Sequence, residues 1–195
     1  MTQNKKLFMI SLGCSKNLVD SEVMLGLLEK DGYTVAEKPD DAELLLVNTC
    51  GFIGSAVQEA IDEILELARY KQMDPAKKLV VTGCLVQRYG IELEKELPEV
   101  DLFIGTNGFH NIVDQLHGEK PAHPTAHSLE QSPFLMDSTL PRKVSTPPHR
   151  AYMKITEGCI NRCSYCLIPA IRGRLRSRPL PDLLNEARRL EAGGI

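Results

Sequence analysis

The sequence has 195 residues, of which 43% are hydrophobic and 25% charged, so it has the composition of a globular protein with one or two domains. Its net charge of −3 gives no overall basic field that favours nucleic acid, and no apolar run approaches a membrane span. The apolar run before Cys14 is very short for a signal peptide, so we expect a cytoplasmic protein. In such a protein, six cysteines favour metal binding or catalysis over disulfides.

Apolar runs and stretches with helical spacing alternate along the first part of the chain. Asn17 is predicted to cap the first helix, which Gly32 ends, and Ser55 with Gln58 forms a capping-box pattern before the second. Strands are predicted at residues 6–12, 33–36, 43–48, 78–82 and 101–104, and further helices at about 86–97 and 107–116. Because the main strands are continuously apolar, we expect an α/β domain with an open parallel sheet, Rossmann- or flavodoxin-like, covered on both faces.

Three cysteines each lie just past the carboxyl end of a predicted strand, namely Cys14, Cys50 and Cys84. In a parallel sheet these ends lie along one edge, where open α/β folds place their ligands. We therefore expect the three thiols to come together and hold an iron–sulfur cluster. The alternative is three independent small core residues, because free cysteine is commonly buried.

Residues 119–149 differ in character, because prolines are scattered among polar residues with little periodicity. This pattern predicts a linker between a cluster-binding domain at residues 1–118 and a second unit at residues 150–195. The five histidines of the sequence show no metal-ligand spacing, so we expect them to be surface residues.

After a short apolar run at residues 151–155, a loop carries Cys159, Cys163 and Cys166 at Cys-x3-Cys-x2-Cys spacing. Three thiolates in one loop can face a single metal centre, and thiolate is a ligand of iron–sulfur clusters. A [4Fe–4S] cluster with three thiolates keeps one iron open to a small molecule. The alternatives are zinc, for which no second cysteine or histidine pair follows, and buried cysteines without metal.

Four arginines occupy every second position from Arg172 to Arg178, and an extended segment would place them on one face. They could grip a phosphate, a carboxylate or an acidic substrate. The alternative is a face that is solvated or paired internally. Pro181 is predicted to begin a helix that ends near Gly193.

The cysteine loop, with Tyr165 directly before its last cysteine, resembles that of the radical S-adenosylmethionine (SAM) enzymes. The resemblance implies that Cys159, Cys163 and Cys166 ligate the cluster, that SAM chelates the open iron, and that Tyr165 lies near the SAM adenine. For Tyr165 the alternative is hydrophobic packing at a barrel rim.

The two halves together resemble the methylthiotransferase family of radical SAM enzymes. Residues 11–22, Ser-Leu-Gly-Cys-Ser-Lys-Asn-Leu-Val-Asp-Ser-Glu, are similar to the RimO-like branch, which modifies an aspartate of a ribosomal protein. Residues 168–169, 172–173 and 176–178 also look like that branch, whereas Ser15 stands where it often has proline. The resemblance implies that residues 150–195 begin a partial TIM-type barrel with its first strand–helix unit.

The resemblance also implies the chemistry. Two [4Fe–4S] clusters and SAM would serve a radical reaction that places a methylthio group on the β-carbon of an aspartate in a small-subunit ribosomal protein. The cluster on Cys14, Cys50 and Cys84 would hold the transferred sulfur, and the protein would need an external electron donor and sulfur source. Relatives are about twice as long, so we expect a fragment of a longer enzyme, with little turnover by itself. The alternatives are methylthiolation of a transfer RNA adenosine and a non-catalytic electron-transfer module.

Overall fold

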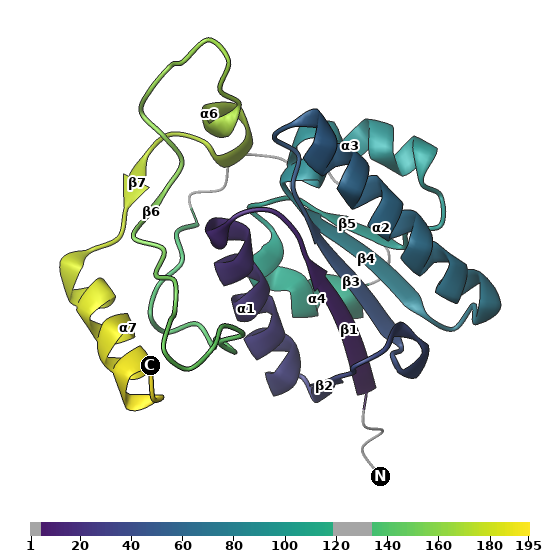
Figure 1. Cartoon of the computed structure of the whole chain (residues 1–195), viewed down its shortest axis with the longest axis horizontal. Coiled ribbons are helices and arrows are strands. Elements are labelled where there is room, and N and C mark those ends of the chain that lie inside the picture. The colour runs from purple at the N-terminus through teal and green to yellow at the C-terminus, as the bar shows by residue number, and fades with distance from the viewer. Residues whose placement is uncertain (1–4, 119–133) are drawn as a thin grey trace.

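The computed structural model describes residues 5–118 and 134–195. Five parallel strands form one sheet in the order β2-β1-β3-β4-β5 (Figure 1). The strands are β1 (Lys5–Ser11), β2 (Tyr33–Val35), β3 (Leu44–Thr49), β4 (Lys78–Gly83) and β5 (Leu102–Ile104). Each corresponds to a predicted strand, and the predicted α/β fold with an open parallel sheet is confirmed.

Helices cover both faces of this sheet (Figure 1). They are α1 (Ser15–Lys30), α2 (Gly54–Met73), α3 (Cys84–Glu96) and α4 (Ile112–His117), with 3-10 turns η1 (Pro39–Asp41) and η2 (Phe109–Asn111). Along β3 the side chains alternate: Leu44 and Leu46 pack with α1 and α4, whereas Leu45 and Val47 pack with α2 and α3. All four are at most 1% exposed, which explains why this strand is apolar throughout.

Both predicted helix caps are wrong. Helix α1 begins at Ser15, before Asn17, and the side chain of Asn17 lies in the interior of the protein. Helix α2 begins at Gly54 without a side-chain cap, and Gln58 donates a hydrogen bond to Asp62 instead. At Asn17 a tertiary contact replaces local capping, because its amide has partners in other loops.

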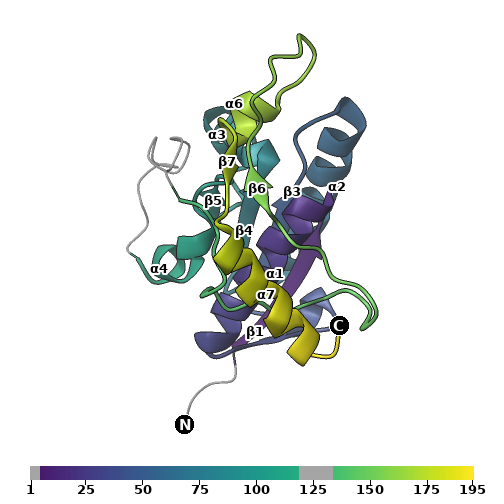
Figure 2. The same cartoon turned by 90° about the vertical axis from the view of Figure 1, so that its left-hand side faces the viewer.

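The C-terminal part of the chain contains β6 (Thr156–Glu157), α6 (Ile168–Arg172), β7 (Arg176–Ser177) and α7 (Leu180–Ala192). β6 and β7 form a separate antiparallel pair, and the apolar run at 151–155 precedes it without regular structure. Helix α7 follows β7 and lies on the outer side of α1, away from the sheet (Figures 1 and 2).

Helix α1 is enclosed on two sides, because residues 134–150 pack on the side that faces away from the sheet. Met136 is 4% exposed and belongs to the same core as Val19 and Val23 of α1. The backbone at Pro141 passes so close to Gly26 that a Cβ there would be 2.7 Å from it. The rest of the predicted linker, residues 119–133, lies outside the described residues.

The predicted row of four arginines on one face is wrong. Arg172 ends α6 and Gly173 has a φ of +76°, so the segment is not continuously extended. Arg172 and Arg178 are 3% and 5% exposed and are paired with carboxylates, whereas Arg174 is exposed. For the two buried arginines the internally paired alternative therefore holds. None of the helices in the described ranges has the length and apolarity that a membrane span requires.

Candidate metal centres

The sheet register brings the loops of Cys14, Cys50 and Cys84 to one edge. Thr49 pairs with Gly83, so Cys50 and Cys84 directly follow neighbouring positions on adjacent strands. Ser11 pairs with Asn48 on the other side of β3, which places the turn to Cys14 beside the turn to Cys50. The predicted convergence of these three loops is therefore seen.

Two glycines allow these loops to approach one another closely. A Cβ on Gly13 would lie 2.9 Å from Cβ and 3.4 Å from Sγ of Cys50. A Cβ on Gly83 would lie 2.5 Å from the carbonyl oxygen of Thr49. Both glycines have positive φ values, +93° and +103°, which other residues rarely adopt. The backbone around the cysteines thus requires glycine for its conformation and for space.

Asn17 joins all three loops. Its Nδ2 donates to the carbonyl oxygens of Leu12 at 3.1 Å and Thr49 at 2.8 Å. Its Oδ1 lies 3.6 Å from the Sγ of Cys84, within hydrogen-bond range for a thiol. Asn48 supports it by donating to the backbone oxygen of Asn17 at 2.9 Å. The sequence prediction missed this role because a capping residue and a buried bridging residue have the same local pattern.

The three thiols of this edge differ in exposure. Cys14 is exposed, Cys50 is half-buried and Cys84 is buried. Burial raises the pKa of the Cys84 thiol, and the nearby Arg172 guanidinium opposes that rise. The edge thus offers one thiol to solvent and holds another beside a fixed positive charge.

The second set of cysteines lies on a loop that projects from the body between β6 and α6 (Figure 1). Cys163 is exposed, and Cys159 and Cys166 are half-buried. The base of the loop is fixed by a 3.2 Å hydrogen bond from the Cys159 amide to the Gly173 carbonyl. Tyr165 is 82% exposed, so its ring packs against little of the chain that the structure describes.

A buried group of charges lies between the two cysteine sets. Arg172 bonds to Asp20 at 3.1 Å and to Glu157 at 3.2 Å, and Lys154 bonds to both carboxylates. Burial raises the pKa of Glu157, but Lys154, Arg172 and Lys16 together lower it to about 2. The carboxylate is therefore ionised at neutral pH, and it connects the start of the projecting loop to α1.

Within residues 5–118 and 134–195, no three Cys, His, Asp or Glu side chains are grouped closely enough to hold one metal ion. In an iron–sulfur cluster each thiolate binds a different iron, so its ligands stand further apart than those of one ion. The first site has three thiols on loops that glycines allow to approach closely, with an arginine nearby. This donor set suits an iron–sulfur cluster, which is bound by thiolates and carries negative charge. The projecting loop offers the same donor set.

Comparison with known proteins identifies the family. The match to the family described as "Uncharacterized protein family UPF0004" spans residues 6–105, more than half of the chain. The chain belongs to this family. The matched UPF0004 region contains Cys14, Cys50 and Cys84, and it ends before the loop with the other three cysteines.

Two relatives that share one name align with this chain over both cysteine sets. "Ribosomal protein uS12 methylthiotransferase RimO" of Syntrophus aciditrophicus is 52% identical over 193 residues, and its Desulfotalea psychrophila counterpart is 53% identical over 190 residues. These alignments cover 95% and 97% of this chain but 42% and 43% of the relatives. The chain thus spans about two-fifths of the length of these relatives. The predicted resemblance to the ribosomal-protein methylthiotransferases is confirmed.

A solved structure shares the fold of this UPF0004 chain. It is the radical S-adenosylmethionine methyltransferase TsrM from Kitasatospora setae, with a TM-score of 0.57 and 20% identity. The match covers 99% of this chain and 46% of that chain. At this identity the similarity concerns the fold alone.

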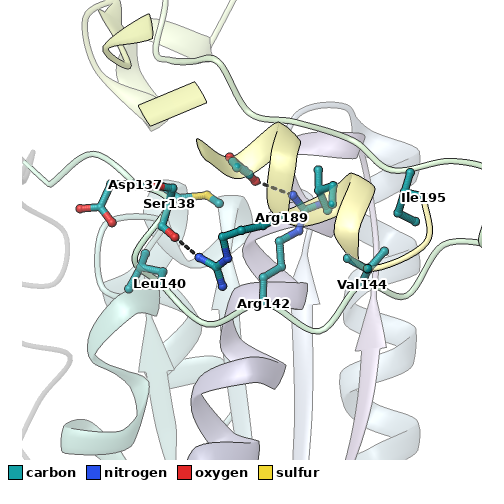
Figure 3. Close-up of a pocket in the computed structure, with 11 residues that line it drawn as sticks. Asp137, Ser138, Leu140, Arg142, Val144, Arg189 and Ile195 are labelled. Atoms are coloured by element: carbon teal, nitrogen blue, oxygen red, sulfur yellow. Dashed lines mark hydrogen bonds and ion pairs between the residues drawn. The ribbon is translucent and has the colours of Figure 1, made fainter. Parts of the chain in front are cut away.

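A cavity of about 200 Å³ lies between residues 136–144 and α7 of this UPF0004 chain (Figure 3). Arg142 pairs with Glu186 at its edge at 2.7 Å, and Arg189 donates to the Ser138 carbonyl. None of the described residues that line it is a cysteine. The cavity is therefore separate from the candidate metal centres.

Proposed function

We propose that the protein is a radical SAM methylthiotransferase that modifies the β-carbon of an aspartate in ribosomal protein uS12. The observation that carries the proposal is the presence of two three-cysteine sets whose loops are linked through the buried Arg172, which donates hydrogen bonds to Asn17 and Asp20. The names of the relatives support the choice of uS12 as substrate.

We assign one [4Fe–4S] cluster to Cys14, Cys50 and Cys84, and a second to Cys159, Cys163 and Cys166. When bound, the clusters and SAM would supply the electron, the radical and the methylthio group. Three protein thiolates for each cluster keep one iron available to an exogenous ligand.

The residues of this chain position and shield these groups. The exposed Tyr165 would offer its ring to the adenine of SAM, and the exposed Cys14 lies at the side of the first site that an incoming substrate can reach. Asn17 and Asn48 hold the strand-end loops in a fixed arrangement, which reduces the reorganisation needed when ligands bind.

The domain assignment follows from these sites. Residues 1–118 form the domain for the first cluster, residues 119–149 connect it to the second, and residues 150–195 begin the radical SAM domain. The protein would work in the cytoplasm, where uS12 is available, with an external electron donor and sulfur source.

Metal analysis tests the assignment of the sites. Iron and sulfide content and Mössbauer spectra should be measured anaerobically on the chain and on variants with either cysteine set replaced by alanine. Two clusters in the original chain and one in each triple variant are expected. A triple variant that keeps the full iron content would contradict the assignment.

A chimera tests the substrate. Residues 1–195 should replace the corresponding part of the Desulfotalea psychrophila relative, and the chimera should be produced in cells lacking their own enzyme. Mass analysis should find methylthiolated uS12, and Cys14→Ala in the chimera should abolish it. If transfer RNA is methylthiolated while uS12 is not, the substrate is transfer RNA. If the chimera forms no 5′-deoxyadenosine when reductant and SAM are added, the protein acts in electron transfer alone.

A further inference from the structure

Arg172 occupies a buried position between the two cysteine sets. It ends α6, directly after the projecting loop, and is 3% exposed. One guanidinium nitrogen donates to Asn17 Oδ1 at 2.5 Å and to Asp20 Oδ2 at 3.1 Å, and the other donates to Asp20 Oδ2 at 3.1 Å and Glu157 Oε2 at 3.2 Å. This planar fork therefore bonds to α1 and to β6 together.

On one side, Arg172 reaches the first cysteine set. Asn17 Oδ1, which accepts its hydrogen bond, is also the neighbour of the Cys84 thiol at 3.6 Å. The Arg172 guanidinium and the Cys84 thiol therefore share Asn17 Oδ1 as a common hydrogen-bond partner. Arg172 is thus the cation of the buried group that faces the thiols.

On the other side, Arg172 reaches the second cysteine set through Glu157. This residue begins the turn into the projecting loop, and its Oε1 accepts a hydrogen bond from the Gly158 amide at 3.2 Å. Gly158 has a φ of +73° and packs directly against the backbone at Gly173. The base of the loop and the Arg172 side chain therefore form one packed unit.

The charges of this buried group do not balance. Three cations share two carboxylates, the cations being Lys16, Lys154 and Arg172 and the carboxylates Asp20 and Glu157. Lys16 is partly exposed, but Lys154 and Arg172 are buried. The two buried cations are matched by the two carboxylates, and the third positive charge is that of the partly exposed Lys16. Thiolates that bind metal would add negative charge beside Arg172, which this third positive charge leaves room for.

We propose that Arg172 is a positioning residue: it fixes the loops of Cys14 and Cys84 against the base of the Cys159 loop and supplies the positive charge that offsets the thiolates of the first cluster. The second part of this inference rests on the proposed function. The first part concerns the protein chain alone and stands without a cluster.

Amide hydrogen exchange on the iron-free chain tests the positioning role. Arg172→Gln is expected to raise exchange about tenfold in residues 12–16, 49–53 and 83–86 and in residues 157–167, because both sides lose their shared partner. Arg172→Lys should give a smaller rise, since it keeps the charge and loses the fork. Arg174→Gln, an exposed arginine in the same segment, is the control and should change none of these regions.

A charge-balanced variant separates positioning from general unfolding. Asp20→Asn with Arg172→Gln removes one charge of each sign, so the fold should be retained. This double variant should still exchange faster in both loop regions and remain protected in β3 and β4. Unchanged exchange in either loop region would overturn the positioning role.

Iron release tests the charge role. In a chain with Cys159, Cys163 and Cys166 replaced by alanine, the rate of iron transfer to a chelator should rise about tenfold with Arg172→Gln and less than threefold with Arg172→Lys. Equal rates for Gln and Lys would overturn the charge role. If that chain holds no iron, the proposed function and the charge role fail together, while the exchange result still decides the positioning role.

Discussion

Glu22 of α1 and Arg142 of the segment that crosses it form an ion pair of 2.6 Å, although 120 positions separate them in the chain. Both side chains are buried, Glu22 to 1% and Arg142 to 7% exposure. Glu22 also accepts hydrogen bonds from the amide and hydroxyl of Ser145 at 2.7 and 2.8 Å. A carboxylate that was expected on the first helix of a sheet domain thus anchors the chain that follows that domain.

Replacement of Arg142 by Met should destabilise the protein strongly. The change leaves the buried Glu22 without its cation, so the free energy of unfolding should fall by about 3–5 kcal/mol. Lys143→Met is the matched control, because Lys143 pairs with Glu29 at a site where both side chains are 41% exposed. This substitution should lower the free energy of unfolding by less than about 1 kcal/mol. Urea unfolding of the two variants measures the difference, and equal losses would contradict this account.

Replacement of Gly83 by Ala should disrupt the edge that holds the first cysteine set. The new Cβ would clash with Thr49, and the alanine backbone would have to keep an unfavourable positive φ. The free energy of unfolding is therefore expected to fall by more than about 3 kcal/mol. Gly32→Ala isolates the effect of φ, because Gly32 has a φ of +93° but no atom within 4 Å of the new Cβ. This control should cost about 1–2 kcal/mol. Thermal unfolding compares the stability of the two variants. Equal losses of stability would mean that the close approach of Gly83 to Thr49 does not contribute to the cost of the substitution.

Asp182 should make stability depend on pH in the acid range. Burial raises the pKa of its carboxyl, but hydrogen bonds from Ser138 and the charge of Arg178 outweigh burial and hold the pKa below 3.8. The native state therefore binds this proton less readily than the unfolded state, so the stabilisation is complete above pH 3.8 and is lost as the pH falls further.

Asp182→Asn measures this contribution. The variant should be less stable by about 1–2 kcal/mol from neutral pH down to about pH 5, and the difference should shrink below the ordinary pKa. Glu191→Gln, an exposed carboxylate in the same helix, serves as the control. A difference that stays constant into the acid range would show that Asp182 acts without its charge.

Tyr165 offers a test of SAM binding that leaves the fold intact. Because the ring is 82% exposed, Tyr165→Leu should change the free energy of unfolding by less than about 0.5 kcal/mol. Loss of aromatic stacking should weaken SAM binding to the iron-loaded chain about tenfold, as measured by calorimetry. Ile160→Ala, at 74% exposure in the same loop, should leave affinity unchanged. Equal affinities of the Tyr165 variant and the original chain would remove Tyr165 from the site.

The parallel sheet and the meeting of three strand-end loops could be predicted from the sequence. Both follow from local signals, because a continuously apolar strand such as β3 indicates burial on both faces, and parallel strands end on the same edge. The position of Cys50 beside Cys84 is then a consequence of register.

The contacts across α1 could not be predicted in the same way. Asn17, Asp20 and Glu22 have the pattern of a helix start and a solvated face, and each has a partner more than 100 positions away. Arg172 and Arg174 are chemically identical in the sequence, yet one is buried and the other exposed. Gly173, with a φ of +76°, turns the chain between them, and a spacing of two residues does not reveal that turn.

The outer side of α1 is acidic where the crossing segment lies, with Asp20 and Glu22 among its buried residues. If that segment were removed, these carboxylates would meet water, in which a negative charge is well solvated. Removal of residues 134–195 would also bare apolar side chains such as Val19 and Val23, which share a core with Met136, so a polypeptide shortened to residues 5–118 is expected to self-associate unless it is kept dilute. In such a polypeptide, magnetic spectroscopy would report on the Cys14 site alone, because the sample would contain no second iron centre.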